Sequence, residues 1–377
     1  MSAACDACLR RGFLVGHLAS RIAGLLDSSR RRVPGLLSLG DERLVAAVAG
    51  DGAAEALAFL DGFDPAAARA QVRASGARAL CRHDPAYPAQ LEPLSDAPSV
   101  LFLAGEGDIR EAVSLEPSVA IVGARRASDY GLEVTRELGR GLGAAGVTVV
   151  SGMALGIDAA AHRACLDGGG VPVAVLACGT DVVYPRTNRM LYERILERGV
   201  VLSELPPGQR PFRWSFPARN RIMAGLSQIT VVVEAADPSG SLITGTFAGQ
   251  LGRTVGAVPG QVTSRRAAGS NGLLKDGALF VTSPQDLLDE LFGTESDRAR
   301  TARSPSRPEP PADPVRALLL EAVEAGLGIE GICAHAGLPV HEARAGLSRL
   351  EAAGHVSRDA LGVYRPRLAV ADGRPAA

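Results

Sequence analysis

Short apolar runs alternate with longer amphipathic stretches between residues 119 and 281. Apolar runs without polar alternation are typical of strands buried on both faces of a parallel sheet. The stretches between them carry apolar residues at helical spacing. The pattern therefore predicts an α/β domain with a doubly wound, mostly parallel sheet. The expected strands are 119–122, 147–150, 171–176, 200–202, 229–234, 254–258 and 279–281, and the clearest helices are 130–145, 157–166 and 188–198.

The flanking regions follow other patterns. Residues 1–75 predict a small helical domain, compatible equally with a SAM- or helix-hairpin-helix-like module and with a plain packing domain; its expected helices are 14–26, 41–49, 53–60 and 65–74. The α/β domain then covers residues 76–293, and the proline-rich residues 294–313 read as a flexible linker.

Residues 314–367 predict a C-terminal winged helix-turn-helix domain. Its third helix carries as many glutamates as arginines and has no positive face, which favours packing or protein contact over duplex reading. The expected elements are helices 314–325, 329–336 and 341–353 and a hairpin over 356–364.

The amino-acid composition limits the kinds of partner and cellular compartment that are expected for this chain. The chain is 46% hydrophobic with a formal net charge of −1, so any contact with nucleic acid has to come from a local patch. The sequence shows neither a secretory leader pattern nor an apolar run long enough to span a membrane. A cytoplasmic protein with reduced thiols and no membrane association is expected.

Six cysteines are scattered along the chain, and Cys5 and Cys8 form one Cys-x-x-Cys pair. This pair could join Cys81 and His83 in a zinc site. Because a second clean ligand pair is missing from the sequence, ordinary thiols are the favoured interpretation, and no metal site is predicted.

Two nucleotide-binding motifs can be set aside. Gly141, Gly143 and Gly146 spell the dinucleotide fingerprint, but they end a predicted helix instead of opening one after a strand, so we interpret them as helix-ending and close-packing glycines. The only lysine, Lys275, is followed by Asp276, which excludes a P-loop. No cofactor is expected.

One stretch concentrates positive charge and aromatic rings. Residues 205–233 contain no carboxylate, yet they include Arg210, Arg213, Arg219 and Arg221 with Phe212, Trp214 and Phe216 threaded among them. Arginines supply fixed charge for phosphates and aromatic faces supply stacking surfaces for unpaired bases, which is what a groove for single-stranded nucleic acid needs.

The segments after the predicted strands share the same chemistry: glycines, hydroxyls and arginines. Examples are the turn at 123–131, the segment at 151–158 and the segment at 237–244. Parallel strands end at one edge of the sheet, beside the reversal of strand order where ligands bind. Bare amides and helix N-termini there favour anions, so several such turns predict a polyanion longer than one nucleotide.

These motifs resemble the DprA/Smf DNA-processing family. The resemblance covers roughly residues 80–292 and rests on motifs in the family's order and spacing, with a lead-in at Tyr87-Pro88, Leu91, Asp96-Ala-Pro98 and Leu101. The motifs are Gly123-Ala-Arg125, residues 151–158, residues 216–222, residues 239–244 and Gly269-Ser-Asn271 with Lys275-Asp-Gly-Ala278. Ala124 stands where the family usually has Ser or Thr.

The resemblance implies an extended Rossmann fold that binds single-stranded DNA, dimerises and loads the RecA recombinase on incoming strands during natural transformation. We expect a non-catalytic, homodimeric protein in which arginines and Lys275 hold phosphates and aromatic residues stack on bases. The candidate DNA-binding residues are Gly123, Arg125, Arg126, Ser151, Gly152, Phe212, Trp214, Phe216, Arg219, Asn220, Arg221, Ser241, Thr244, Asn271 and Lys275.

The main alternative is a small-nucleotide enzyme of the N-glycosidic hydrolase type. Its candidate carboxylates would be Asp158, Asp181, Glu204 and Glu234 at the same sheet edge. The Pro-Gly-Gly-x-Gly-Thr-x-x-Glu signature of such enzymes is absent, because the corresponding stretch reads Asp237-Pro-Ser-Gly-Ser241.

Overall fold

The computed structural model describes residues 4–28, 34–115, 117–293, 311, 313–353, 355–358 and 363–366. They belong to two compact units, residues 1–302 and residues 303–377. Most of the predicted linker, 294–313, lies outside the described residues. Among the helices that the structure describes, none combines the length and the apolar composition needed to cross a membrane.

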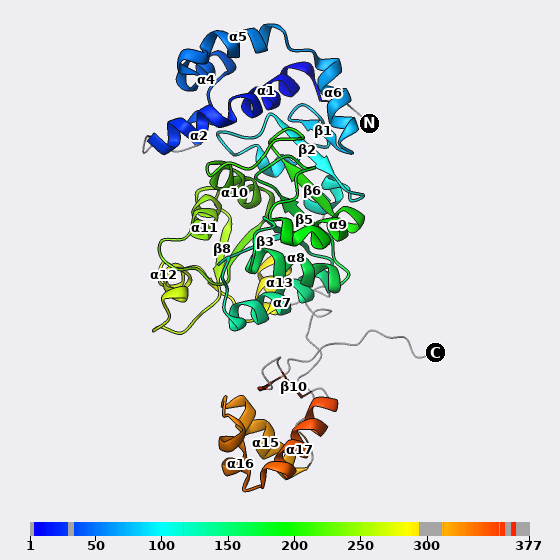
Figure 1. The fold of residues 1–377 in the computed structure, drawn as a ribbon, viewed down its shortest axis with the longest axis vertical. Helices are drawn as coiled ribbons and strands as arrows, with labels where there is room; N and C mark the ends of the chain where they lie inside the picture. Colours follow the sequence, from blue (N-terminus) through cyan, green and yellow to red (C-terminus); the bar gives the residue numbers. More distant parts are fainter. Residues whose placement is uncertain are drawn as a thin grey trace, which may run out of the picture. The chain divides into compact units, whose positions relative to one another are not determined.

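The larger unit is built on a nine-stranded sheet in the order β1-β2-β6-β5-β4-β3-β7-β8-β9 (Figure 1). Strands β3 to β9 are parallel to one another, whereas β2 runs antiparallel to both β6 and β1. The strand order reverses at β3, because β4 and β7 pair with its opposite sides. The strands are β1 Arg78–Cys81, β2 Val100–Ala104, β3 Ser118–Val122, β4 Thr148–Ser151, β5 Pro172–Val175, β6 Val200–Ser203, β7 Ile229–Val232, β8 Thr254–Ala257 and β9 Leu279–Phe280.

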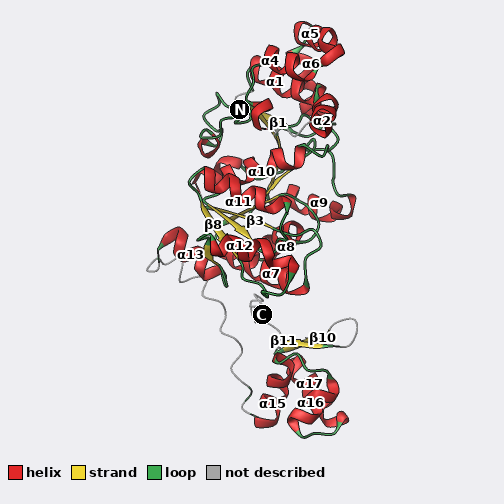
Figure 2. Ribbon diagram, turned by 90° about the vertical axis from the view of Figure 1, so that its left-hand side faces the viewer, coloured by secondary structure: helices red, strands yellow, loops and turns green. Residues whose placement is uncertain are grey.

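Helices cover both faces of this sheet (Figure 2). Some helices begin with a capping side chain; Ser128, for example, accepts a hydrogen bond from the Gly131 amide at the start of α7. The helices are α1 Asp6–His17, α2 Ala19–Ser28, α3 Pro34–Leu37, α4 Asp41–Val48, α5 Ala53–Asp61, α6 Pro65–Ala74, α7 Asp129–Ala144, α8 Ile157–Asp167, α9 Arg189–Arg198, α10 Ser215–Leu226, α11 Gly240–Gln250, α12 Ala268–Lys275 and α13 Pro284–Phe292, with short turns η1 Gly50–Gly52, η2 Ala89–Leu91, η3 Glu111–Leu115, η4 Arg186–Asn188 and η5 Arg265–Ala267.

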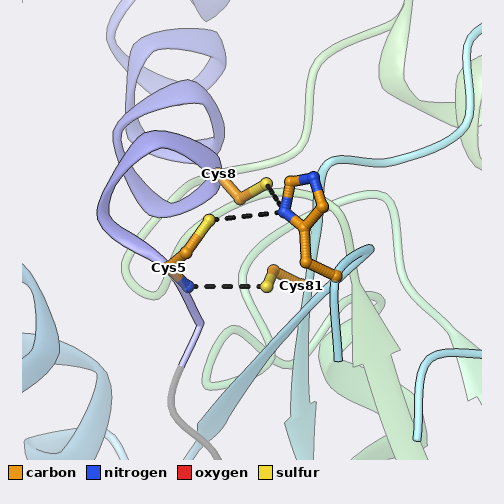
Figure 3. A group of neighbouring side chains, drawn as sticks. Cys5, Cys8 and Cys81 are labelled. Carbon is orange, nitrogen blue, oxygen red and sulfur yellow. Dashed lines mark hydrogen bonds between the residues drawn. The ribbon is translucent and has the colours of Figure 1, made fainter. Parts of the chain in front are cut away.

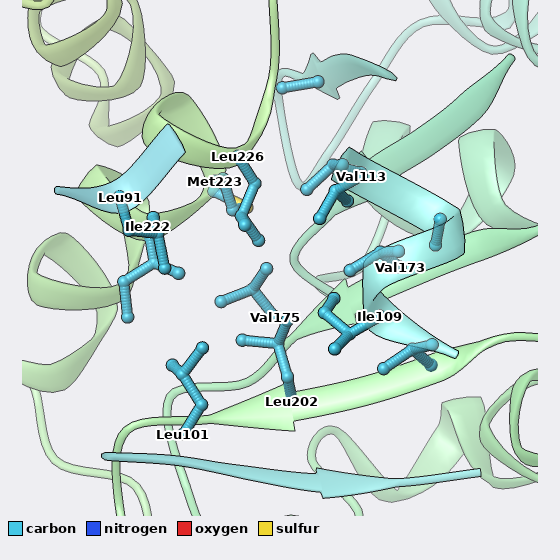
Figure 4. Packing of buried hydrophobic residues seen from close by; sticks show 14 of the residues in the cluster. Leu91, Leu101, Ile109, Val113, Val173, Val175, Leu202, Ile222, Met223 and Leu226 are labelled. Atoms are coloured by element: carbon cyan, nitrogen blue, oxygen red, sulfur yellow. The ribbon is translucent and has the colours of Figure 1, made fainter. Parts of the chain in front are cut away.

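The core lies in two apolar layers, one on each side of the sheet. Alternate residues of a strand point to opposite faces, so Val119 and Ile121 of β3 pack with α7, α8 and α13, whereas Ala120 and Val122 belong to the other layer. In that layer, strands β5 and β6 face α10 (Figure 4). Because each central strand is covered by apolar residues on both faces, its apolar residues do not alternate with polar ones.

The predicted strands are confirmed, each within two residues of its expected ends. Strands β1 and β2 were not predicted; β1 forms the edge of the sheet, and β2 lies between β1 and β6, antiparallel to both. The glycine interpretation is also confirmed. Gly143 packs so closely that an added Cβ would lie 2.6 Å from the Cys165 carbonyl oxygen, and Gly146 has a φ of +72° just after α7.

The helices α1 to α6 pack against one edge of the sheet. Their apolar residues share one cluster with Leu205, Trp214 and Ala218, and another with Val100 and Phe102 of β2. The predicted helix 14–26 is wrong, because the chain forms two helices there. The Leu18 amide bonds the Leu14 carbonyl at the end of α1, and α2 begins at the next residue.

The smaller unit consists of helices and a two-stranded antiparallel ribbon around one apolar core. Leu319, Ile332, Leu347 and Val356 are buried there. The predicted helices and hairpin are found with ends shifted by at most two residues. The elements are α15 Pro314–Glu324, α16 Ile329–Ala336, α17 Val340–Ala352, β10 Val356–Arg358 and β11 Tyr364–Pro366.

Candidate nucleic-acid interface

A cavity of about 310 Å³ lies between the segments that follow β3, β4, β6 and β7. We call it the strand-end cavity. It sits beside the reversal of strand order at β3, the place where open parallel sheets bind their ligands. Its lining is Val122, Gly123, Ala124, Arg125, Ala154, Asp158, Phe216, Pro217, Arg219, Asn220, Met223, Ser239, Gly240, Ser241, Ile243 and Thr244.

The turn after β3 joins the strand-end segments to each other. The Ala124 amide donates to the Glu234 carbonyl at 2.7 Å, and the Ala124 carbonyl accepts from the Ile157 amide at 3.2 Å. A Cβ on Gly123 would lie 2.7 Å from the Ile157 side chain, so only glycine fits the close approach. This packing fixes where the next residue, Arg125, leaves the turn.

Arg125 and two aromatic rings form an exposed cluster at the mouth of the cavity, which we call the aromatic–arginine cluster. The Arg125 guanidinium lies 5.0 Å from the centroid of the Phe216 ring, and the Tyr184 ring lies 5.7 Å from the same ring. Arg125 is exposed and Tyr184 is 44% exposed. A cation and aromatic faces thus share one accessible surface.

Tyr184 is absent from the predicted site residues. The signal for it was in the sequence, because Tyr184 lies in the loop that follows β5, at the same edge as the predicted residues. Arginine stacked on aromatic rings is the combination that the sequence analysis sought in residues 210–221.

Arg219 lies at the floor of the strand-end cavity and is only 6% exposed. Its guanidinium donates to the carbonyls of Gly152 and Val175, and it lies 3.7 Å from the carboxylate of Asp158. A Cβ on Gly152 would lie about 2 Å from the guanidinium, so a larger residue there would displace the Arg219 side chain. Burial raises the pKa of Asp158 and lowers that of Arg219, while the charge of each partner opposes the shift.

Arg221 requires a correction. We predicted a phosphate contact, but its side chain is fully buried, with Nε 2.8 Å from Asp96 Oδ2 and Nη2 2.8 Å from Glu204 Oε1. Burial alone would lower the pKa of Arg221, yet the two carboxylates raise it above its ordinary value. Its donors are used inside the protein, so Arg221 is a structural residue.

Phe212 and Trp214 also require a correction. Trp214 is 4% exposed, and its indole Nε1 donates to the Ala19 carbonyl at 2.9 Å. Phe212 is half-buried and packs in the same cluster beneath the N-terminal helices, with Arg210 over its ring at 5.3 Å. Of the three predicted stacking residues, only Phe216 lines the cavity.

The start of α11 forms one wall of the cavity. Ser239 caps this helix, its hydroxyl lies 2.8 Å from that of Ser241, and the buried Thr244 lines the same wall. Asn220 donates to the Gly240 carbonyl at 3.1 Å, which ties α10 to this helix start. A helix N-terminus carries partial positive charge that favours an anion.

The other predicted residues are divided between structural roles and the outer surface. The Ser151 hydroxyl is buried and donates to the Ile121 carbonyl, so its predicted DNA contact is corrected. The Asn271 amide bonds both backbone groups of Gly260 and holds a loop. Arg126 and Lys275 are exposed, but neither lines the strand-end cavity.

The carboxylates of the hydrolase alternative are all engaged with protein groups. Asp158 faces Arg219, and Glu204 is paired with Arg221. Glu234 accepts from the Ser128 amide at 2.7 Å, and Asp181 accepts from the Gly208 amide at 2.8 Å. The arrangement therefore uses these groups to position loops and arginines.

Comparison with known proteins gives consistent matches. A family model described as DNA recombination-mediator protein A matches residues 78–292, which run from β1 to α13. Protein Smf from Synechocystis sp. is 37% identical over 309 residues, covering 74% of this chain and 78% of that protein.

Solved structures agree with the family match. DprA from Streptococcus pneumoniae superimposes with a TM-score of 0.60 and 34% identity, covering 75% of this chain and 95% of that chain. DprA from Helicobacter pylori, solved to study its single-stranded DNA binding mode, matches with a TM-score of 0.52 and 28% identity, covering 57% of this chain and 95% of that chain.

Proposed function

This chain belongs to the DprA/Smf family of DNA-processing proteins, and on that premise we propose that it binds single-stranded DNA without catalysing a reaction on it. The observation that carries the proposal is the aromatic–arginine cluster at the mouth of the strand-end cavity. A related structure described for its single-stranded DNA binding mode supports the choice of ligand.

In this proposal the phosphates contact the exposed cations and the helix start. Arg125 and Arg126 leave the turn after β3 into solvent, and the N-terminus of α11 offers partial positive charge on the opposite wall. Arg219 contributes its positive charge from below and keeps Gly152 and Asp158 in place. Lys275 would contact the strand outside the cavity.

The bases would stack on the aromatic side chains. Tyr184 and Phe216 present their rings beside Arg125, and each stacked base contributes about 1–3 kcal/mol. Stacking is tolerant of sequence, because every base has an aromatic face. We therefore expect little base preference and an affinity that falls steeply with salt.

The narrower function follows the family. Recombination mediation is part of the family description, and it supports the proposal that the chain loads RecA on incoming single strands during natural transformation and acts as a homodimer. We also assign the helices before residue 76 to an accessory domain and residues 314–367 to a winged-helix domain that contacts protein. The absence of a positive face on the third helix supports a protein partner.

The test is fluorescence anisotropy with labelled oligo-dT and an equivalent duplex. We expect preference for the single strand and a salt slope of about −0.7 per neutralised phosphate. Arg125→Ala should weaken binding by about tenfold or more, because a hydrogen bond to a charged group contributes about 1.5–3 kcal/mol. Phe216→Leu should remove about 1–3 kcal/mol of stacking.

Arg136→Ala is the matched control, since Arg136 is an exposed arginine on α7 away from the cavity lining. Equal affinities of the Arg125→Ala and Arg136→Ala proteins, both folded, would refute the site. Binding that stays constant from about 50 to about 200 mM salt would refute the phosphate contacts altogether.

A further inference from the structure

Three cysteines and one histidine meet at the base of the N-terminal helices, far from the strand-end cavity in the chain. The Sγ atoms of Cys5, Cys8 and Cys81 and a ring nitrogen of His83 all lie within 4.8 Å of one another. Figure 3 shows the three thiols converging from the start of α1 and the end of β1.

The fold brings together the two pairs that the sequence analysis considered for a zinc site and did not favour. Cys5 caps α1 and Cys8 follows one turn later, so both thiols leave the helix on the same side. Cys81 is the last residue of β1, and the chain turns directly after it to bring His83 back to the helix. Cys8 and His83 are 75 residues apart in the chain and meet only through this packing.

The distances match those of a tetrahedral site. His83 Nδ1 lies 3.5 Å from Cys5 Sγ and 3.4 Å from Cys8 Sγ. Around a tetrahedral zinc ion, a sulfur and a nitrogen ligand lie about 3.6 Å apart, given the usual bond lengths. The four ligand atoms therefore lie close enough together to reach one metal ion.

The surroundings also suit a metal. Cys8 and Cys81 are buried among Leu9, Val72 and Phe102, whereas His83 is exposed and leaves an approach from solvent. The Cys5 backbone amide points at Cys81 Sγ at 3.4 Å, as expected for a donor to a thiolate. Soft sulfur ligands with one imidazole select zinc over magnesium or calcium.

We propose that Cys5, Cys8, Cys81 and His83 bind one Zn²⁺ ion that joins helix α1 to strand β1. Four protein ligands complete the coordination shell, so the site is structural and leaves no position for substrate. The metal would fix the N-terminal helices to the edge of the sheet, where β1 has a partner on one side only. Its role is independent of the DNA-binding proposal.

The experiment uses the full chain, purified under reducing conditions and loaded with zinc before removal of excess metal. Elemental analysis should give about one zinc per chain. Cobalt titration of the reduced apoprotein should give the intense visible bands of a tetrahedral thiolate site. Chelation should lower the melting temperature of the wild-type protein.

Cys8→Ser and His83→Ala should each weaken zinc binding by more than about 100-fold, since loss of an outer partner alone costs about 10–100-fold. Cys333→Ser is the matched control, because Cys333 lies in the smaller unit, outside the cluster. It should keep the full zinc content and the cobalt spectrum.

Several outcomes would overturn the proposal. A zinc-loaded wild-type protein with far less than one zinc per chain, a cobalt spectrum of oxygen ligands, or iron and sulfide in place of zinc would each do so. Equal zinc contents in the Cys8→Ser and Cys333→Ser proteins would also refute it. The cobalt titration needs only the wild-type chain, so poor folding of a variant does not prevent a decision.

Discussion

Replacing Arg221 with methionine removes a cation from the interior of the protein. Methionine keeps the length and the apolar stem of the side chain but leaves the carboxylates of Asp96 and Glu204 without their partner. The carbonyl oxygens of Ala218 and Asp96 also lose a donor, each at a distance of 2.7–2.8 Å.

The cost follows from burial. The side chains of Arg221, Asp96 and Glu204 are 0%, 3% and 15% exposed, so water cannot replace the lost partner of Asp96 and can replace that of Glu204 only in part. Breaking a buried ion pair by removing one member typically costs about 3–5 kcal/mol. With a urea m-value of about 3 kcal/mol/M, the unfolding midpoint should fall by about 1–1.7 M.

The assay is urea unfolding followed by fluorescence of Trp214, which is buried in the same unit. Arg213→Met is the matched control, because Arg213 is an exposed arginine of the same segment and should leave the midpoint unchanged. A triple variant with Asp96→Asn and Glu204→Gln should recover part of the loss, since no buried charge is then left alone.

Two results would refute this reasoning. A midpoint of the Arg221→Met protein equal to that of the Arg213→Met protein would show that the buried pairs contribute nothing. A fully stable Arg221→Met protein with lost affinity for oligo-dT would restore Arg221 as a phosphate contact.

Two further predictions concern stability. Burial and Arg219 lower the pKa of His162 to about 3, so the unfolded chain takes up a proton first and stability is lost as pH falls below about 6.5. At pH 5 this loss amounts to about 2 kcal/mol. The free energy of unfolding in urea should therefore fall by about 2 kcal/mol less between pH 7 and pH 5 in the His162→Leu protein than in the wild type. An equal fall in both proteins would contradict the prediction. Gly152→Ala should lower the free energy of unfolding by about 1–3 kcal/mol, because the added Cβ displaces the Arg219 guanidinium. Gly272→Ala is the control and should not destabilise the protein, because no atom lies near its added Cβ. Equal urea midpoints of the two variants would contradict the prediction.

The sequence predicts the α/β core well because its strands are buried on both faces and therefore read as apolar runs. The edge strand β1 lacks that signal, because Arg78 and Ala79 are only half-buried. Strand β2 carries it, since Val100–Leu103 are apolar and buried, and it was missed all the same. The site was predicted at the level of segments: the turn at Gly123–Arg125 and the start of α11 do line one cavity.

Single residues were harder to assign, because a sequence does not reveal which side of a helix is covered. Arg219 and Arg221 are close neighbours on α10, yet one reaches the cavity floor and the other pairs with Asp96. Trp214 seemed available for stacking because its covering partner, the start of α2, lies near the other end of the sequence. For the same reason, the sequence offered Cys81 and His83 as possible companions of Cys5 and Cys8 but did not show that the four side chains meet.

The docking of Trp214 beneath α2 has a practical consequence for anyone trimming the chain. A fragment limited to residues 78–292 would retain every side chain at the mouth of the cavity. It would also remove the cover from Leu205, which follows β6, and from Trp214 and Ala218 at the start of α10. Such a fragment would expose an aggregation-prone apolar surface next to the cavity that it was made to isolate.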